Sequence, residues 1–162
     1  MFLKVSYFDT KGKVLKSTIL KNSNGLNEAL TFNGTKSSAC VYKNGIAQGE
    51  FKWFYPNGII SSSSFYHNDK KTGKHTGFDE DGKLAEEGYY EDDLKTGKWT
   101  WYYPDGKTET TGIYKKGNRE GLWVWYNKNG NKDFEGNYKD GERHGEIIMY
   151  SEKEELHVKK IY

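Results

Sequence analysis

A tyrosine recurs every 24 residues in this sequence, and that period limits the possible fold more than any other feature. The tyrosine series is Tyr42, Tyr66, Tyr90, Tyr114, Tyr138 and Tyr162. Glycines recur at the same interval in two further series, which are Gly49, Gly73, Gly97, Gly121 and Gly145, and Gly58, Gly82, Gly106 and Gly130. A fixed period of this size is typical of a repeat array, in which each repeat buries its apolar surface against its neighbours.

Each 24-residue repeat contains two short segments in which apolar residues alternate with polar ones. Neither segment has the length or the spacing of an amphipathic helix, so each predicts a β-strand. The strands are separated by turn sequences such as Pro104-Asp105-Gly106 and Asp140-Gly141, and Gly and Asp accept the left-handed backbone that tight turns need. We therefore predict an all-β fold: a single elongated, twisted antiparallel sheet of tandem hairpins, with no helices of note.

The N-terminal part follows the period less closely. Gly25 and Gly34 keep the phase of the two glycine series, whereas the segment from Tyr7 to Lys13 resembles a later strand and turn but lies two residues out of phase. We expect residues 1–37 to form a degenerate N-terminal capping half-unit followed by a repeat whose sequence has diverged from the others. Residues 38–162 would be the array proper, ending in a lone capping strand whose lysines discourage edge-to-edge pairing.

The composition indicates an ordered, aromatic-rich protein with few aliphatic residues for a core. Val, Ile, Leu and Phe are scarce, but 13 Tyr and 5 Trp supply apolar area, and the net charge is only +2. The 25 Lys and Arg are interleaved with 23 Asp and Glu, so no basic stripe is present for a phosphate backbone, and we expect no nucleic-acid partner. The same balance disfavours an anionic membrane surface.

Catalytic and metal chemistry find little support in the sequence. His67 and His75 lie on different predicted strands, and His144 and His157 lie far along the array, whereas zinc needs three or four converging ligands. The serines at positions 61–64 have no accompanying His and Asp in a recognisable arrangement. We therefore predict that the protein is not an enzyme and binds no cofactor.

Two of the most regular repeats resemble a known motif. The segments from Gly112 to Trp123 and from Gly136 to Glu146 are similar to the MORN repeat in its bacterial variant form, and the resemblance extends over residues 38–162 and weakly over 18–37. It implies hairpin repeats in a single-layered, curved sheet that serves as an interaction module. Some similar bacterial proteins are described as YwqK-like antitoxins, and other MORN arrays have been linked to phospholipid contact and oligomerisation. The resemblance implies no catalytic residue, because the repeat itself carries none.

Apolar pairs, mostly aromatic, recur in the second strand of successive repeats: Phe51 and Trp53, Trp99 and Trp101, Trp123 and Trp125, and Ile147 and Met149. Because a single sheet lacks a second layer, we interpret these rows as a core in which side chains bury one another along one face. The alternative is that part of the row stays exposed as a groove for an extended peptide or a glycan. The candidate binding residues are then Trp53, Trp99, Trp101, Tyr103, Trp123 and Trp125.

The repeat from Ser61 to Leu84 departs from this pattern. Gly77 stands where the neighbouring repeats have Trp53 and Trp101. The departure predicts a notch in the row, which is either simple drift of one repeat or a pocket with the two tryptophans as walls and His75 at its floor.

We predict a non-enzymatic protein–protein interaction or scaffold module whose curved face or exposed edge binds another protein. One form of this hypothesis is an antitoxin-like role. Homo-oligomerisation through the sheet edge is compatible with this role. A second hypothesis is carbohydrate or cell-wall binding, because Gly97 to Tyr103 resembles the Gly-x-Trp-Tyr-Tyr core of choline- and glucan-binding repeats. A third is lipid-surface binding. The expected compartment is the cytoplasm if Met1 is the native start, and the surface or periplasm if an export signal was removed.

Overall fold

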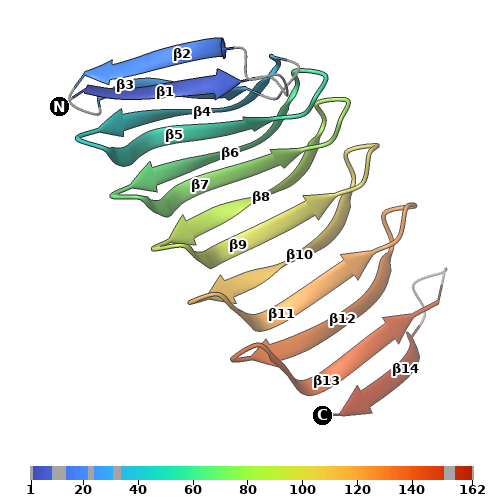
Figure 1. Cartoon of the computed structure of the whole chain (residues 1–162). Coiled ribbons are helices and arrows are strands. Elements are labelled where there is room, and N and C mark those ends of the chain that lie inside the picture. Colours follow the sequence, from blue (N-terminus) through green and yellow to red (C-terminus); the bar gives the residue numbers. More distant parts are fainter. Residues whose placement is uncertain (1, 9–13, 22–23, 31–33, 152–155, 162) are drawn as a thin grey trace. The chain divides into compact units, whose positions relative to one another are not determined.

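The computed structural model describes the backbone of residues 2–8, 14–21, 24–30, 34–151 and 156–161, and the side chains of residues 24–30, 34–151 and 161. Every regular element in these ranges is a β-strand (Figure 1). The chain divides into two compact units, an N-terminal unit, Met1–Gly82, and a C-terminal unit, Lys83–Tyr162.

The described residues of the N-terminal unit form seven strands. They are β1 (Phe2–Phe8), β2 (Val14–Lys21), β3 (Gly25–Leu30), β4 (Lys36–Lys43), β5 (Ile46–Phe54), β6 (Ile60–His67) and β7 (Lys70–Phe78). β1 and β2 form a two-stranded sheet with each other, and β3 to β7 pair antiparallel in chain order. Gly25 of β3 pairs with Tyr42 as Gly49 of β5 pairs with Tyr66. β3 therefore pairs like the second strand of a repeat. Part of the segment from Tyr7 to Lys13 lies outside the described residues.

In the part of the C-terminal unit that the structure describes there are also seven strands, all antiparallel and in chain order. They are β8 (Leu84–Glu91), β9 (Leu94–Tyr102), β10 (Thr108–Lys115), β11 (Asn118–Tyr126), β12 (Lys132–Lys139), β13 (Glu142–Tyr150) and β14 (Leu156–Ile161). Tyr114 pairs with Gly97, and Tyr138 pairs with Gly121, so the two residue series are register partners. Tyr162 and the lysine side chains of β14 lie outside the described residues.

The predicted fold class is confirmed. The strands of the repeats form an open antiparallel sheet of hairpins with a period of 24 residues, and the described part of the chain contains no helix. It follows that no helix in that part could span a membrane.

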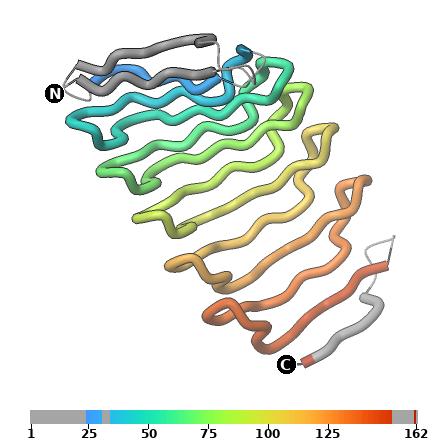
Figure 2. The backbone as a smooth tube through the Cα atoms, in the orientation of Figure 1, coloured from blue at the N-terminus to red at the C-terminus, as the bar shows by residue number. Residues whose placement is uncertain are grey.

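Two kinds of turn lie at opposite ends of the strands, as Figure 2 shows within each unit. The short turn is left-handed at both residues, for example at Asp92 and Asp93, with φ of 48° and 69°. This is the geometry that joins twisted strands in a two-residue hairpin. In the longer turn, the Gly106 N–H donates to the Tyr103 carbonyl at 2.8 Å, and the Tyr103 N–H donates to the Lys107 carbonyl at 2.8 Å. Backbone geometry therefore explains why Gly, Asp and Asn recur here.

The glycines of the tyrosine-paired series do not lie in turns. Gly97 and Gly121 lie inside β9 and β11 with φ of 64° and 66°. On β11, Glu120 pairs with Ile113 and Val124 with Thr111, so three residues of β11 face the single residue Gly112. A left-handed glycine accommodates such a bulge. The bulge places Trp123, two residues after Gly121, over Gly112.

Candidate interaction surfaces

The core of the C-terminal unit is a row of aromatic rings on one side of the sheet. We call this side the tryptophan face; it is formed by Trp99, Trp101, Trp123 and Trp125 with Tyr90, Tyr114 and Tyr138. Trp99 and Trp123 are 0% and 1% exposed. The rings of Tyr90 and Trp99 meet edge to face at 5.2 Å, and those of Tyr114 and Trp123 at 5.0 Å. Edge-to-face contacts add to the stabilisation from burial alone, so these rings substitute for a second layer.

Glycines on the preceding strands make room for the two buried indoles. A Cβ atom on Gly88 would lie 2.2 Å from the Trp99 ring, and one on Gly112 would lie 2.2 Å from the Trp123 ring. The indole N–H groups of Trp99 and Trp123 donate to the carbonyls of Tyr89 and Ile113, each at 3.1 Å. Each indole is therefore fixed by both shape and a hydrogen bond.

The remaining tryptophan rings are half-buried, and cations of the same chain cover parts of the row. The Lys95 ammonium lies 3.9 Å from the Trp99 ring centroid and 5.0 Å from that of Trp101. The Arg119 guanidinium lies 4.6 Å from Trp123 and 5.6 Å from Trp125. These are cation–π distances, so the aromatic cages of this face already hold cations.

Other candidate residues also have internal partners. Trp101 donates to the Glu86 carboxylate at 2.7 Å, and the Tyr103 hydroxyl donates to the Tyr126 carbonyl at 2.7 Å. Trp125 stacks on Phe134 with centroids 4.0 Å apart. In the N-terminal unit, Trp53 stacks on Phe51 at 4.2 Å. Aromatic packing and bonding within the chain thus engage most of the predicted binding residues.

The irregular repeat replaces a tryptophan–glycine pair with a histidine–serine pair. His75 is 6% exposed and Ser64 is 1% exposed. They face each other in the sheet, and Ser64 Oγ lies 2.7 Å from His75 Nδ1, within hydrogen-bond distance. Gly77 is also buried. His75 therefore lies in the core, and the burial of Ser64 keeps its hydroxyl from acting as a nucleophile toward an outside substrate. Trp53 and Trp101 belong to different units.

The opposite side of the sheet carries apolar side chains that are not buried. The residue directly before each series tyrosine points away from the tryptophan face and is about half exposed in four repeats: Val41 44% and Phe65 46% in the N-terminal unit, and Tyr89 50% and Ile113 50% in the C-terminal unit. We call this side the opposite face. Singly scattered apolar residues are normal on a surface, but recurrence at one repeat position is not random scatter.

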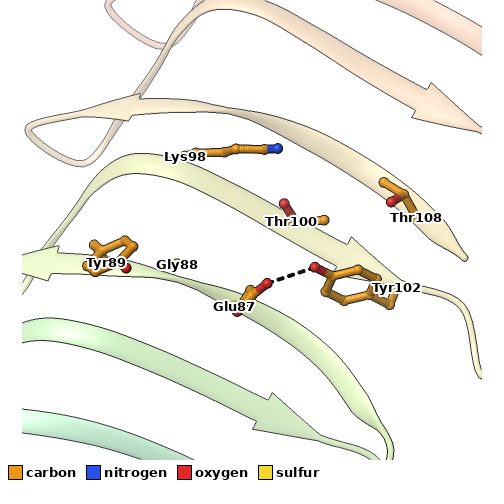
Figure 3. Close-up of a pocket in the computed structure, with 7 residues that line it drawn as sticks. All are labelled: Glu87, Gly88, Tyr89, Lys98, Thr100, Tyr102 and Thr108. Atoms are coloured by element: carbon orange, nitrogen blue, oxygen red, sulfur yellow. Dashed lines mark hydrogen bonds between the residues drawn. The ribbon is translucent and has the colours of Figure 1, made fainter. Parts of the chain in front are cut away.

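A pocket of about 270 Å³ lies on the opposite face of the C-terminal unit (Figure 3). Its lining residues are Glu87, Gly88, Tyr89, Lys98, Thr100, Tyr102 and Thr108. Lys98, Thr100 and Tyr102 alternate along β9 and so share a face. The Tyr102 hydroxyl donates to the Glu87 carboxylate at 2.8 Å, and burial together with this bond raises the pKa of Tyr102.

The sequence contained a signal for this surface. The position before each tyrosine is Val, Phe, Tyr or Ile in four successive repeats, and alternation along a strand places it on the other side from the tyrosine. The candidate binding residues were instead predicted on the tryptophan face, because the aromatic pairs are the more conspicuous pattern. Among the described residues no group of three or more His, Cys, Asp or Glu side chains could hold a metal ion.

Tandem hairpins, a left-handed glycine in every second strand and a one-sided aromatic core define a single-sheet repeat protein. Four successive segments, residues 47–68, 71–92, 95–116 and 119–140, match the family model of the MORN repeat variant. They cover more than half of the chain, which therefore belongs to the MORN repeat variant family. MORN repeats indicate a repeat-type binding or scaffold module.

No curated protein matches the sequence significantly, so the finer similarity to YwqK-like antitoxins stays a prediction. Similar solved structures include a variant of S. aureus TarM in complex with fondaparinux, alpha-GlcNAc-glycerol and UDP, with 14% identity and a TM-score of 0.41 over 67% of this chain and 21% of that chain. Another TarM structure gives 14% identity and a TM-score of 0.29 over 63% of this chain and 18% of that chain.

A GtfA/B complex bound to UDP and GlcNAc gives 13% identity and a TM-score of 0.28 over 98% of this chain and 26% of that chain. The chain spans 18% to 26% of the length of these structures. At these scores the likeness carries no functional information.

Proposed function

We propose that the protein is a non-enzymatic protein-binding module and that the opposite face, not the tryptophan face, is its binding surface. The observation that carries the proposal is the half-exposed apolar residue before the series tyrosine, repeated at Val41, Phe65, Tyr89 and Ile113. A single sheet needs one buried face for stability, and the aromatic row supplies it. Apolar side chains kept on the other face at a fixed period have no structural task, and exposed apolar patches mark interaction sites.

The carbohydrate hypothesis is not favoured. A site that stacks on sugars or encloses choline needs aromatic rings that are free to accept the ligand. Here Lys95 and Arg119 lie over the rings of the two regular repeats, and Trp99 and Trp123 are buried. We expect tryptophan fluorescence to be unchanged by choline or by cell-wall polysaccharide.

The non-enzymatic part of the proposal rests on the burial of the nucleophile and base that the fold brings together. Ser64 and His75 are in hydrogen-bond contact, but neither is accessible. An antitoxin-like role, which the family resemblance suggests, would be one version of protein binding in which the partner is a toxin.

In-cell photo-crosslinking tests the proposal. A photoreactive amino acid replaces Ile113 or Tyr89 on the opposite face, or Lys128, an exposed residue of a turn, as the matched control. We expect one defined protein to crosslink at positions 113 and 89 and not at 128, and the purified partner to lose affinity for the Ile113→Lys variant. Crosslinks that do not depend on the face, or tight binding of a small ligand by a protein with no partner, would refute it.

A further inference from the structure

On the opposite face of the C-terminal unit, exposed apolar and charged side chains lie on successive strands. Lys98 of β9 pairs directly with Ile113 of β10, and Tyr89 lies on β8, the other neighbour of β9. Tyr89 pairs with Thr96, two residues before Lys98 on β9, and Tyr89 and Lys98 line the same pocket. Neighbouring strands are about 4.8 Å apart, so the strands that carry Tyr89 and Ile113 are about 10 Å apart, with the strand of Lys98 between them. Leu122 of β11, 48% exposed, adds a further apolar side chain.

Lys98 is the charged centre of this pattern. It is exposed, and its ammonium makes no hydrogen bond or ion pair with any residue that the structure describes. The nearby Glu87 carboxylate already accepts the Tyr102 hydroxyl. Two repeats earlier, at the same repeat position, Glu50 pairs within the chain with Lys52 at 2.8 Å and accepts a hydrogen bond from the Ser63 hydroxyl at 2.7 Å. The positive charge at Lys98 is therefore available to an acidic group from outside.

The spacing discriminates between two shapes of ligand. An α-helix rises 1.5 Å per residue, so residues seven apart are about 10.5 Å apart on one side, and a residue three or four along lies midway. An extended strand rises about 3.3 Å per residue, so residues on one of its faces are about 6.6 or 13 Å apart. The apolar–charged–apolar spacing of about 10 Å thus fits a helix lying across the strands.

From this we infer that the opposite face of the C-terminal unit docks an amphipathic helix of a partner protein across β8 to β11. The helix carries apolar residues seven positions apart, which pack on Tyr89 and Ile113, and an Asp or Glu between them, which pairs with Lys98. Glu87, on the Tyr102 side of the pocket, repels an acidic residue placed there and so directs it to Lys98. The inference rests on the proposed function and names the partner's chemistry.

A peptide selection tests the inference. Phage that display randomised 20-residue peptides are selected on the purified full chain, and the enriched peptides are synthesised. We expect them to become helical on binding by circular dichroism, to carry the seven-residue apolar spacing with an acidic residue between, and to bind Lys98→Glu about five- to tenfold more weakly. Exchange of the peptide's acidic residue for Lys should restore binding to Lys98→Glu. Lys128→Glu, in a turn, is the matched control and should bind as the wild type does.

The outcomes separate the inference from the proposed function. Peptides that lose binding to Ile113→Lys or Ile113→Ser but stay extended, or that bind Lys98→Glu as well as wild type, overturn the helix inference and leave the opposite face as the binding surface. Peptides that bind all variants equally, or a failure to enrich any peptide, overturn both. Unfolding midpoints of the variants, all at exposed positions, show that the fold is kept.

Discussion

Gly112 and Trp123 pack so closely that a single methyl group on Gly112 would lie 2.2 Å from the indole ring. Both lie in β-strands, and Trp123 is 1% exposed. Because the ring is fixed by Tyr114 and by its bond to the Ile113 carbonyl, it cannot move aside. We expect Gly112→Ala to lower the free energy of unfolding by about 3 kcal/mol or more, measured by urea unfolding.

Gly136→Ala is the matched control for this substitution. Gly136 occupies the same repeat position, but its partner is Ile147, and a Cβ atom there would lie 3.0 Å from Ile147 Cγ1. An aliphatic side chain adjusts more easily than an indole, so we expect a loss of only about 1 kcal/mol. Equal losses for the two variants would show that ring packing does not set the requirement for glycine.

The pair Ser64 and His75 predicts how the glycine clash can be repaired. Gly112→Ser alone should destabilise the protein, and Trp123→His alone should leave a cavity that costs about 3 kcal/mol. The double variant recreates the hydrogen-bonded pair seen at Ser64 and His75. A double-mutant cycle should therefore give a favourable coupling of about 1 kcal/mol or more. Additive losses would contradict the prediction.

Lys95 should stabilise the fold through the rings beneath it. Lys95→Met keeps the aliphatic stem but removes the ammonium that lies 3.9 Å from Trp99. We expect a loss of about 1 kcal/mol in urea unfolding, because a partly buried cation–π contact is worth that much. Lys98→Met, on the other face, is the control and should change stability by less than about 0.5 kcal/mol. The same loss for both would mean that the ring contact adds nothing.

Cys40 should be chemically inert in the folded protein. Burial, and to a lesser degree the charge of Asp69, raise the pKa of its thiol from 9.0 to about 11. A thiol reagent in mildly alkaline buffer should react only after denaturant is added, since the thiolate is the nucleophile.

The same pKa shift makes stability depend on alkaline pH. The Cys40 thiol ionises in the unfolded chain near pH 9 but not in the folded one until about pH 11. Its contribution to stability is therefore full below pH 9 and is lost as the pH rises toward 11. Cys40→Ala should remove this part of the pH profile, and an unchanged profile would contradict the assignment.

Glu135 should contribute stability that disappears in acid. Burial raises its pKa, but hydrogen bonds from Lys132 and Tyr150, at 2.8 and 2.7 Å, outweigh burial and lower it below 4.5. The contribution is present above the ordinary carboxyl pKa and is lost as the pH falls through the lowered one. We expect Glu135→Gln to cost about 1 kcal/mol at neutral pH and nothing in strong acid. Glu109→Gln, at an exposed position, is the control.

The hairpin array followed from the sequence because its signals are local. The turns at Asp92-Asp93 and at Pro104 to Gly106 depend on backbone conformations that few residues accept. Gly97 and Gly121 were harder to interpret, because a left-handed glycine serves equally in a turn and in a bulge. A glycine that recurs in a repeat of short strands is readily interpreted as a turn residue, but the structure places these two inside strands.

The pairing and the exposure of the candidate residues could not be predicted, because they depend on contacts between residues that are distant in the sequence. The exact pairing of Ser64 with His75 becomes visible only when the register of β6 and β7 is known. Exposure was equally hidden: Trp99 is fully buried while Trp101, two residues on, is only half-buried, because the difference comes from Gly88 and from the rings of neighbouring strands. The sequence could name the aromatic row but could not rank its members.

The fit between Ser64 and His75, and between Gly112 and Trp123, has a consequence for the gain and loss of repeats. Each pair lies within one hairpin, its members 11 residues apart. A duplication or deletion of 24 residues that keeps a hairpin whole carries both members together. Within the hairpin, no new steric conflict then arises. A recombination that cuts between β10 and β11 would separate a large ring from its glycine, so the short turns are poor crossover points and the longer turns are good ones.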